Sequence, residues 1–227
     1  MKKNLNNIIR NSVRGDRRGN LANWFRNERT KFFLGIIGKL KYENLKILDV
    51  GGTDYFWTTL NSQLQCKWRI DLVNLNKEAN NKSAFNYILA DGRDLSAIQV
   101  GYYDIIFSNS VIEHVGDFED QEKFANEIRR VGKKYFIQTP NYYFPFEPHF
   151  LFIGFQFLPV KFRASLIRHF NLGWFKKEMD YKKSLEIAKS VRLLKKKEIQ
   201  ILFPDATIYR EKFLCFTKSF LIYYGFE

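Results

Sequence analysis

Two apolar runs of this sequence end in short polar turns, and these turns hold the residue types that could do chemistry. Residues 47–50 run into Gly51 and Gly52, and residues 105–107 run into the Ser-Asn-Ser of residues 108–110. Apolar runs of this length between turn residues are typical of central strands in a parallel sheet that is covered on both faces. Ligands of such sheets bind just beyond the carboxyl ends of the strands. We therefore expect the two turns to border one cleft, with Asp91 of the segment ADGRDL between them in sequence.

Four motifs follow one another between about residues 45 and 140. They are ILDVGG, a strand that ends in an acid or an amide (RIDLVNLN), DGRDL and YDIIFSNSVIEHV. In this order they resemble the class I S-adenosylmethionine-dependent methyltransferases, nearest the methyltransferase type 11 group. Other nucleotide-binding folds would need GxxxxGK followed by Ser or Thr, or GxGxxG, and the sequence has neither. The resemblance implies S-adenosyl-L-methionine as the cofactor and a doubly wound, seven-stranded Rossmann-like α/β sheet whose last strand is inserted antiparallel.

The resemblance assigns the first turn to the methionine end of the cofactor. Asp49 would accept a hydrogen bond from the amino group, directly or through water, while Gly51 and Gly52 would let the backbone come close to the ligand. The family's loop has the pattern DxGxGxG, and here Thr53 and Tyr55 stand where its second and third glycines would be. The alternative for Asp49 is a strand-terminal residue that ties down the next helix.

The ribose and the adenine are expected to meet the ends of the next two strands. Ribose binding needs acceptors that face two hydroxyl donors, and both Asp71 and Asn74 are candidates. The apolar run of this strand ends at Asn74, so the register favours Asn74, with Asp71 pointing sideways from mid-strand as the alternative. Asp91 would accept from the adenine amino group, and the N–H of Gly92 would face a ring nitrogen. The alternative for both residues is an ordinary turn.

The turn after the fourth strand carries Ser108, Asn109 and Ser110, which we expect to face the cleft. The family uses this stretch to contact the methionine end and to admit the substrate. Some quinone-ring O-methyltransferases have a metal-binding Glu-x-x-Glu-His here, but Ser110 stands where the first Glu would be. We therefore expect no metal.

Three residues are candidate bases for the acceptor: His149, Glu147 and His114. The first two lie in the run FPFEPHFLF, where two prolines flank Glu147 and should stiffen the loop. A methyl transfer to a hydroxyl needs a group that removes the proton, and His or Glu suits that role. The alternative is that Glu147 and His149 only brace the loop.

Strands that alternate with helices predict the elements that position these residues. The expected domains are a basic N-terminal helical extension over residues 1–45 and a methyltransferase domain over residues 46–227. Within that domain, residues 139–198 are expected to form an aromatic-rich insertion, or lid, on the substrate side after the fifth strand. Strands are predicted over residues 46–50, 67–73, 87–90, 103–108, 134–138, 198–203 and 212–217, and helices over residues 21–41, 54–64, 120–131, 161–170 and 182–196.

The net charge of +13 is concentrated in two flanks. Residues 1–46 hold 12 Lys and Arg against 3 Asp and Glu, residues 161–198 hold 12 against 4, and residues 47–160 hold 10 against 14. Such basic flanks attract nucleic acid, anionic lipid or a diphosphate-linked substrate, unless they are simply solvated helices. The apolar run over residues 150–160, beside a basic helix, is either a patch at a membrane surface or a lid packed on the core.

The favoured function is O-methylation of a small-molecule or glycan acceptor, which could be carried on a lipid as in cell-surface polysaccharide assembly. Two alternatives stay open: an RNA methyltransferase that uses the basic flanks, although no RNA-binding module or NPPY motif is present, and a non-catalytic binding protein that keeps the fold. The only cysteines, Cys66 and Cys215, imply no disulfide framework. We therefore expect a cytoplasmic protein. It could also attach peripherally to the inner face of a membrane.

Overall fold

The computed structural model describes residues 20–38, 40, 44–54, 56–58, 60, 68–75 and 85–226. The basic arm expected over residues 1–20 lies outside the described residues except for its last residue. The chain divides into two compact units, residues 1–35 with 142–192, and residues 36–141 with 193–227.

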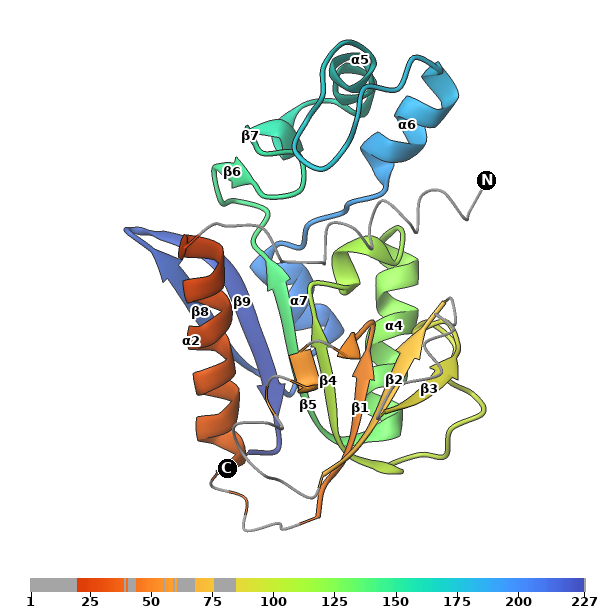
Figure 1. Ribbon diagram of the computed structural model, residues 1–227, viewed down its shortest axis with the longest axis vertical. Coiled ribbons are helices and arrows are strands. Elements are labelled where there is room, and N and C mark those ends of the chain that lie inside the picture. The colour runs from red at the N-terminus through yellow and green to blue at the C-terminus, as the bar shows by residue number, and fades with distance from the viewer. Residues whose placement is uncertain are drawn as a thin grey trace. The chain divides into compact units, whose positions relative to one another are not determined.

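A seven-stranded sheet forms the larger unit, in the order β3-β2-β1-β4-β5-β9-β8 (Figure 1). The pairs β1–β2, β1–β4, β2–β3 and β4–β5 are parallel, and the last strand in sequence, β9, is inserted antiparallel between β5 and β8. This confirms the predicted doubly wound, Rossmann-like methyltransferase sheet. The strands are β1 Lys46–Val50, β2 Arg69–Asn74, β3 Asn86–Leu89, β4 Tyr103–Asn109, β5 Gly132–Pro140, β8 Thr207–Phe213 and β9 Phe216–Tyr224.

Helix α4, Phe118–Val131, contributes one apolar stripe to the core of this unit. Phe124, Ile128 and Val131 recur at helical spacing, are fully buried, and join side chains of β1, β4 and β5 in one cluster. The carboxylate of Asp117 caps the helix by accepting the N–H of Asp120 at 3.1 Å. The short 3-10 helix η1, Ile112–His114, links β4 to this cap, so the carboxyl end of β4 is held against the start of α4.

The smaller unit contains the greater part of helix α2, Asn20–Ile37, and a separate stretch of mixed structure. That stretch holds the short hairpin of β6 Phe146–Glu147 and β7 Phe152–Ile153, the 3-10 helix η2 Phe155–Phe157, and the helices α5 Val160–His169 and α6 Tyr181–Lys189. Helix α5 packs against α6. Among the described residues, no helix is both long enough and apolar enough to cross a bilayer.

Three of the predicted elements are wrong. Residues 198–203 were expected as a strand but lie in helix α7, Lys196–Leu202, apart from Phe203. The carboxylate of Glu198 accepts the N–H of Lys195 at 2.7 Å, which caps a helix, and Ile199 and Leu202 face the core together. The strand predicted over residues 212–217 instead spans the end of β8, a two-residue turn and the start of β9. The helix predicted over residues 182–196 ends at Lys189. The helix expected over residues 54–64 lies partly outside the described residues.

Candidate functional site

The turn after β1 brings the backbone of two glycines close to neighbouring side chains. Gly51 has φ +83°, and its N–H donates to the carbonyl of Val73 at the end of β2 at 2.8 Å. A Cβ at Gly51 would lie 2.5 Å from Cγ2 of Val111. Both the left-handed backbone and the close approach require glycine here. Thr53, which follows the turn, is exposed.

Asp49 lies directly beneath this turn. Its side chain is buried, and Oδ2 accepts a hydrogen bond from Nε1 of Trp57 at 2.7 Å. A Cβ at Gly52 would lie 2.0 Å from the same oxygen, so any side chain at this position would overlap the carboxylate. Burial raises the pKa of Asp49 to about 7, since the charged form loses hydration, and the bond from Trp57 only partly offsets this. A ligand ammonium beside this carboxylate would restore its charge.

The end of β2 separates the two ribose candidates. Nδ2 of Asn74 donates to the carbonyl of Gly52 at 2.8 Å, so Asn74 touches the glycine turn. Asp71 lies in mid-strand opposite Leu48 of β1, and it is buried. Its carboxylate accepts from the hydroxyl of Tyr103 at 2.7 Å and from Nδ2 of Asn86 at 3.2 Å. The structure therefore brings Asn74, and not Asp71, to the carboxyl edge of the sheet.

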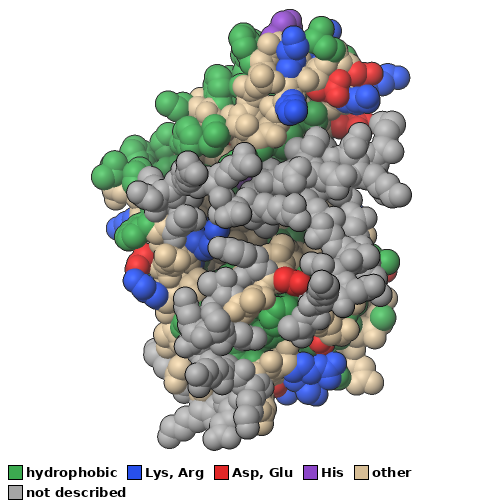
Figure 2. Space-filling model, in the orientation of Figure 1, with side chains coloured by type: hydrophobic (Ala, Val, Ile, Leu, Met, Phe, Trp, Pro, Cys, Tyr) green, Lys and Arg blue, Asp and Glu red, His purple; other side chains and the backbone are tan. Residues whose placement is uncertain are grey.

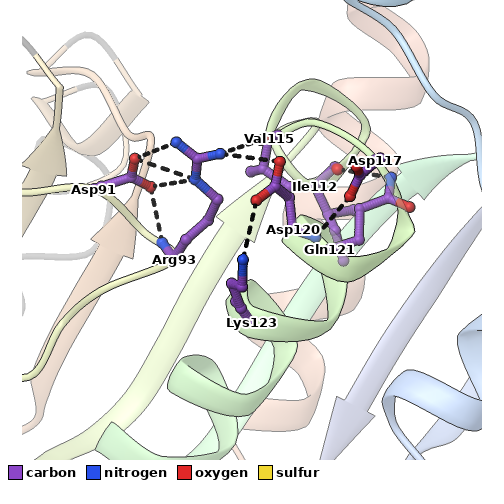
Figure 3. Close-up of polar contacts among 8 residues, drawn as sticks. All are labelled: Asp91, Arg93, Ile112, Val115, Asp117, Asp120, Gln121 and Lys123. Atoms are coloured by element: carbon purple, nitrogen blue, oxygen red, sulfur yellow. Dashed lines mark hydrogen bonds and ion pairs between the residues drawn. The ribbon is translucent and has the colours of Figure 1, made fainter.

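Asp91 forms an ion pair that the sequence analysis did not anticipate (Figure 3). Its carboxylate accepts from Nη2 of Arg93 at 2.7 Å, from Nε of Arg93 at 3.0 Å, and from the backbone N–H of Arg93 at 2.9 Å. The Nη1 atom of Arg93 donates to the carbonyl of Val115 at 3.0 Å and lies 3.1 Å from a carboxylate oxygen of Asp120. The hydrogen bond from Asp91 is the main cause that raises the pKa of Arg93. Arg93 thus fastens the turn after β3 to the junction of η1 and α4.

This ion pair limits what Asp91 can offer an adenine. A carboxylate has about four lone-pair sites, and Arg93 occupies most of them. Gly92 beside it lies tightly against the core, because a Cβ there would come within 2.8 Å of both Val50 and Phe124. The turn of Asp91 and Gly92 is therefore fixed by Arg93 on one side and by the core on the other.

The end of β4 is tied to both neighbouring strands. The buried hydroxyl of Ser108 donates to the carbonyl of Val50 in β1 at 3.0 Å, so it links strands instead of facing a cleft. Asn109 is exposed. Ser110 has φ +57°, which costs energy for a residue other than glycine, and its hydroxyl lies 2.6 Å from Oε1 of Gln138 in β5. Such strained positions cluster at ligand-binding turns.

The 3-10 helix after this turn contains Glu113 and His114. Glu113 is fully buried, and its Oε2 accepts from the hydroxyl of Thr139 at 3.0 Å. His114 is half-buried, and its backbone N–H donates to the carbonyl of Val111 at 2.8 Å. Glu113 therefore joins η1 to the end of β5, beside the strained turn at Ser110.

The other two base candidates belong to the smaller unit. Glu147 is buried, and Oε2 accepts the backbone N–H groups of His149 at 2.8 Å and of Phe150 at 2.7 Å. Oε1 lies 2.6 Å from Nδ1 of His149. Glu147 thus holds the backbone of this loop and one ring nitrogen of His149.

Sequence reasoning missed three residues that shape these sites: Trp57, Arg93 and Gln138. Trp57 follows Asp49 by eight positions, at a spacing that matches no recognised motif. Arg93 could have been suspected, since it follows Asp91 by two residues within a turn. Gln138 meets Ser110 only because β4 and β5 are neighbours, with Asn109 opposite Gln138 in the register.

Comparisons with known proteins point to one kind of domain. Residues 48–135 match the family model described as a methyltransferase domain. Uncharacterized proteins from two strains of Mycobacterium tuberculosis are 38% identical over 48 residues, which cover 21% of this chain and 16% of the relatives' length. This match therefore spans only a small part of those relatives.

Solved structures share the architecture at low sequence identity. The magnesium protoporphyrin IX methyltransferase of Synechocystis with bound SAH is 10% identical, with a TM-score of 0.56 over 96% of this chain and 92% of that one. The CMeT domain of the citrinin polyketide synthase is 13% identical, with a TM-score of 0.55 over 88% of this chain and 51% of that one. A putative O-methyltransferase of Nostoc punctiforme is 10% identical, with a TM-score of 0.51 over 87% and 56%. At these identities the likeness establishes the fold.

Proposed function

We propose that this chain, a class I S-adenosylmethionine-dependent methyltransferase by its domain match and its fold, methylates a hydroxyl oxygen of a small-molecule or glycan acceptor. The observation that carries the methyltransferase assignment is the turn of Asp49, Gly51 and Gly52 at the carboxyl end of β1. This turn pairs a left-handed glycine with a buried carboxylate of raised pKa, which suits the ammonium of an amino-acid moiety.

The residues of the larger unit fit S-adenosylmethionine, which supplies a methyl group on a positively charged sulfur. Asp49, Gly51 and Gly52 would hold the methionine end, and Asn74 would offer its amide oxygen to the ribose. The turn of Asp91 and Gly92 would meet the adenine through backbone N–H and the carboxylate that Arg93 orients.

The preference for oxygen as the acceptor atom rests on the pair of Glu147 and His149. Glu147 lies 2.6 Å from Nδ1 of His149, so the other ring nitrogen, Nε2, is the one that we assign as the base. We propose that Nε2 takes the proton of the acceptor hydroxyl, while Glu147 stabilises the imidazolium that forms. His114 remains the alternative base, from the larger unit.

The test combines cofactor titration with turnover. Titration calorimetry should show S-adenosylmethionine binding to the wild type. His149→Ala should lower methyl transfer by about 100- to 10,000-fold and leave cofactor affinity unchanged. His169→Ala is the matched control, because His169 is an exposed histidine of α5 in the same unit. Full turnover in His149→Ala would remove His149 as the base, and a protein that binds no cofactor would favour a non-catalytic role.

The proposal extends to the kind of acceptor and to the place in the cell where the protein works. The basic flanks support an acceptor carried on a lipid diphosphate and work at an anionic membrane surface. An RNA substrate would use the same charges, and salt-sensitive binding of RNA with methylation of that RNA would favour it instead.

A further inference from the structure

Residues 142–192 expose an unusual share of large apolar side chains. Of the 20 large hydrophobic residues that are exposed among those described, ten lie in this stretch, which is little more than a quarter of the described residues. Isolated exposed residues of this kind are common, but a contiguous group of them marks an interaction site. These residues are Tyr143, Phe146, Leu151, Ile153, Phe157, Phe162, Phe170, Trp174, Met179 and Tyr181.

Four of these residues lie in or next to the β6–β7 hairpin and the 3-10 helix η2, and we call them the hairpin face: Tyr143, Phe146, Ile153 and Phe157. Phe146 and Ile153 are direct partners across the β6–β7 pair, so their side chains lie side by side. The ring of Tyr142 contacts the rings of Tyr143 and Phe157, with centroid distances of 5.2 Å and 5.4 Å. Figure 2 shows hydrophobic side chains gathered at the β6–β7 end of this unit.

The hairpin face is held by a well-ordered loop. The ring of Phe150 stacks on the rings of Phe155 and Phe175, with centroid distances of 4.0 Å and 4.6 Å. These buried rings fix the loop in place. Glu147 accepts two backbone N–H groups from the loop, and the indole and backbone N–H groups of Trp174 donate to the carbonyls of Pro148 and His149. These contacts hold the loop without using the side chains of Phe146 and Ile153.

The central part of this stretch, residues 148–177, carries positive charge and no acidic residue. It contains Lys161, Arg163, Arg168, Lys176 and Lys177. Both Lys176 and Lys177 are exposed, and so is Lys161. Apolar side chains near exposed lysines are typical of a protein surface that lies in the headgroup region of an anionic bilayer.

We propose that the hairpin face docks this protein on an anionic lipid bilayer, with Phe146, Ile153 and Phe157 entering the interface and the cations of residues 148–177 meeting the lipid phosphates. The aliphatic Ile153 at the centre of the face suits acyl chains better than stacked bases, which favour aromatic platforms. Docking here would bring the protein to the membrane that carries a lipid-linked acceptor. This biological role rests on the proposed function, but the docking itself does not.

The experiment is co-sedimentation of the full chain with vesicles of phosphatidylcholine, with and without phosphatidylglycerol. The wild type should bind the anionic vesicles, and raising the salt concentration should weaken the binding. Ile153→Glu puts a carboxylate at the centre of the face and should lower vesicle binding by about tenfold or more. Ile153 is 74% exposed, so the substitution leaves the core untouched. The matched control is Leu214→Glu, an 81% exposed leucine of the β8–β9 turn in the other unit, which should bind as the wild type does.

Equal vesicle binding by Ile153→Glu and the wild type would overturn the proposal, as would a wild type that binds no anionic vesicles. Binding to RNA that Ile153→Glu weakens, without any vesicle binding, would assign the face to RNA. Cofactor titration on the same samples separates this result from the proposed function. Loss of S-adenosylmethionine binding with intact docking would refute the function alone, and the reverse result would refute the docking alone.

Discussion

At the scale of single residues, the candidate cofactor site depends on the close contact between the side chain of Asp49 and the backbone of Gly52. The carboxylate is buried and held by Trp57, and the glycine backbone passes directly over it. An acid kept from water in this way stays protonated at neutral pH more readily than an exposed one. Two predictions follow from this geometry, one steric and one electrostatic.

Gly52→Ala should damage cofactor binding. The added Cβ would lie 2.0 Å from Oδ2 of Asp49, so either the turn or the carboxylate must move. Overpacking of this kind costs about 1–3 kcal/mol, which corresponds to about 5- to 150-fold in affinity. Titration calorimetry measures the effect. Gly35→Ala in α2 is the control, since nothing lies within 4 Å of its Cβ position, and it should bind the cofactor normally. A folded Gly52→Ala protein with wild-type affinity would show that the turn does not meet the ligand.

Asp49 should make the stability of the ligand-free protein fall as the pH rises. Its pKa is about 7 in the folded state, against an ordinary value of 3.8, so between these values the folded protein keeps a proton that the unfolded chain has lost. Stability is therefore greatest below pH 3.8 for this group and decreases up to about pH 7, by about 4 kcal/mol in total. Urea unfolding at a series of pH values measures this slope.

Asp49→Asn is the test of that assignment, because an amide does not titrate. The variant should lose the downward slope between pH 4 and pH 7 that the wild type shows. In the wild type, a cofactor ammonium would favour the ionised carboxylate, so cofactor affinity should increase as the pH approaches 7. Identical pH profiles for the two proteins would mean that another group is responsible.

At the scale of elements, side chains fasten the loops at the carboxyl edge of the sheet to one another. Ser108 ties β4 to β1, Ser110 meets Gln138 of β5, and Arg93 ties the turn after β3 to the start of α4 (Figure 3). Helix and strand formation alone would leave these loops free. These cross-links therefore hold together the loops that carry the candidate cofactor residues.

Arg93→Ala should loosen two loops at once. It removes the partner of Asp91 and the donor to the carbonyl of Val115, and hydrogen bonds to charged groups contribute about 1.5–3 kcal/mol when they are shielded. Since the side chain of Arg93 is 34% exposed, we expect a smaller loss of unfolding free energy, about 1–2 kcal/mol.

The matched control for this measurement is Arg129→Ala. Arg129 is also 34% exposed and pairs with Asp205 at 3.2 Å, but that partner is itself 62% exposed, so the loss should be about 0–1 kcal/mol. Urea unfolding compares the two variants, and cofactor titration shows whether freeing Asp91 alters adenine binding. If both variants lose the same free energy of unfolding, the ion pair of Arg93 contributes no more than an ordinary surface ion pair.

At the scale of the whole molecule, the two compact units carry different kinds of chemistry. The parallel sheet and the candidate cofactor residues belong to the larger unit, which has 19 basic residues against 18 acidic ones. The hairpin face, Glu147 and His149 belong to the smaller unit, where residues 148–177 have no acid at all. A division of this kind lets partner recognition change through one unit while the cofactor site of the other stays constant.

Local sequence patterns were enough to determine much of this protein. Apolar runs with flanking turn residues located β1 and β4, helical spacing located α4, and the order of motifs indicated the methyltransferase sheet. These signals depend on neighbours within a few positions of each other, and the hydrophobic periods that encode them can be seen directly in the chain. The same approach failed for α7, because a short apolar run such as residues 199–203 suits a strand and a buried helix face equally well.

Tertiary structure alone decided the contacts between residues far apart in the chain. It paired Asp71 with Tyr103, 32 positions away, and thereby left Asn74 at the glycine turn. It also set Arg93 between Asp91 and the carbonyl of Val115, and Ser110 beside Gln138. Such contacts depend on strand order and register, which bring different side chains together when a strand slips by a single residue. The sequence thus determined which residues could bind a cofactor, and the packing of the sheet selected which of them meet.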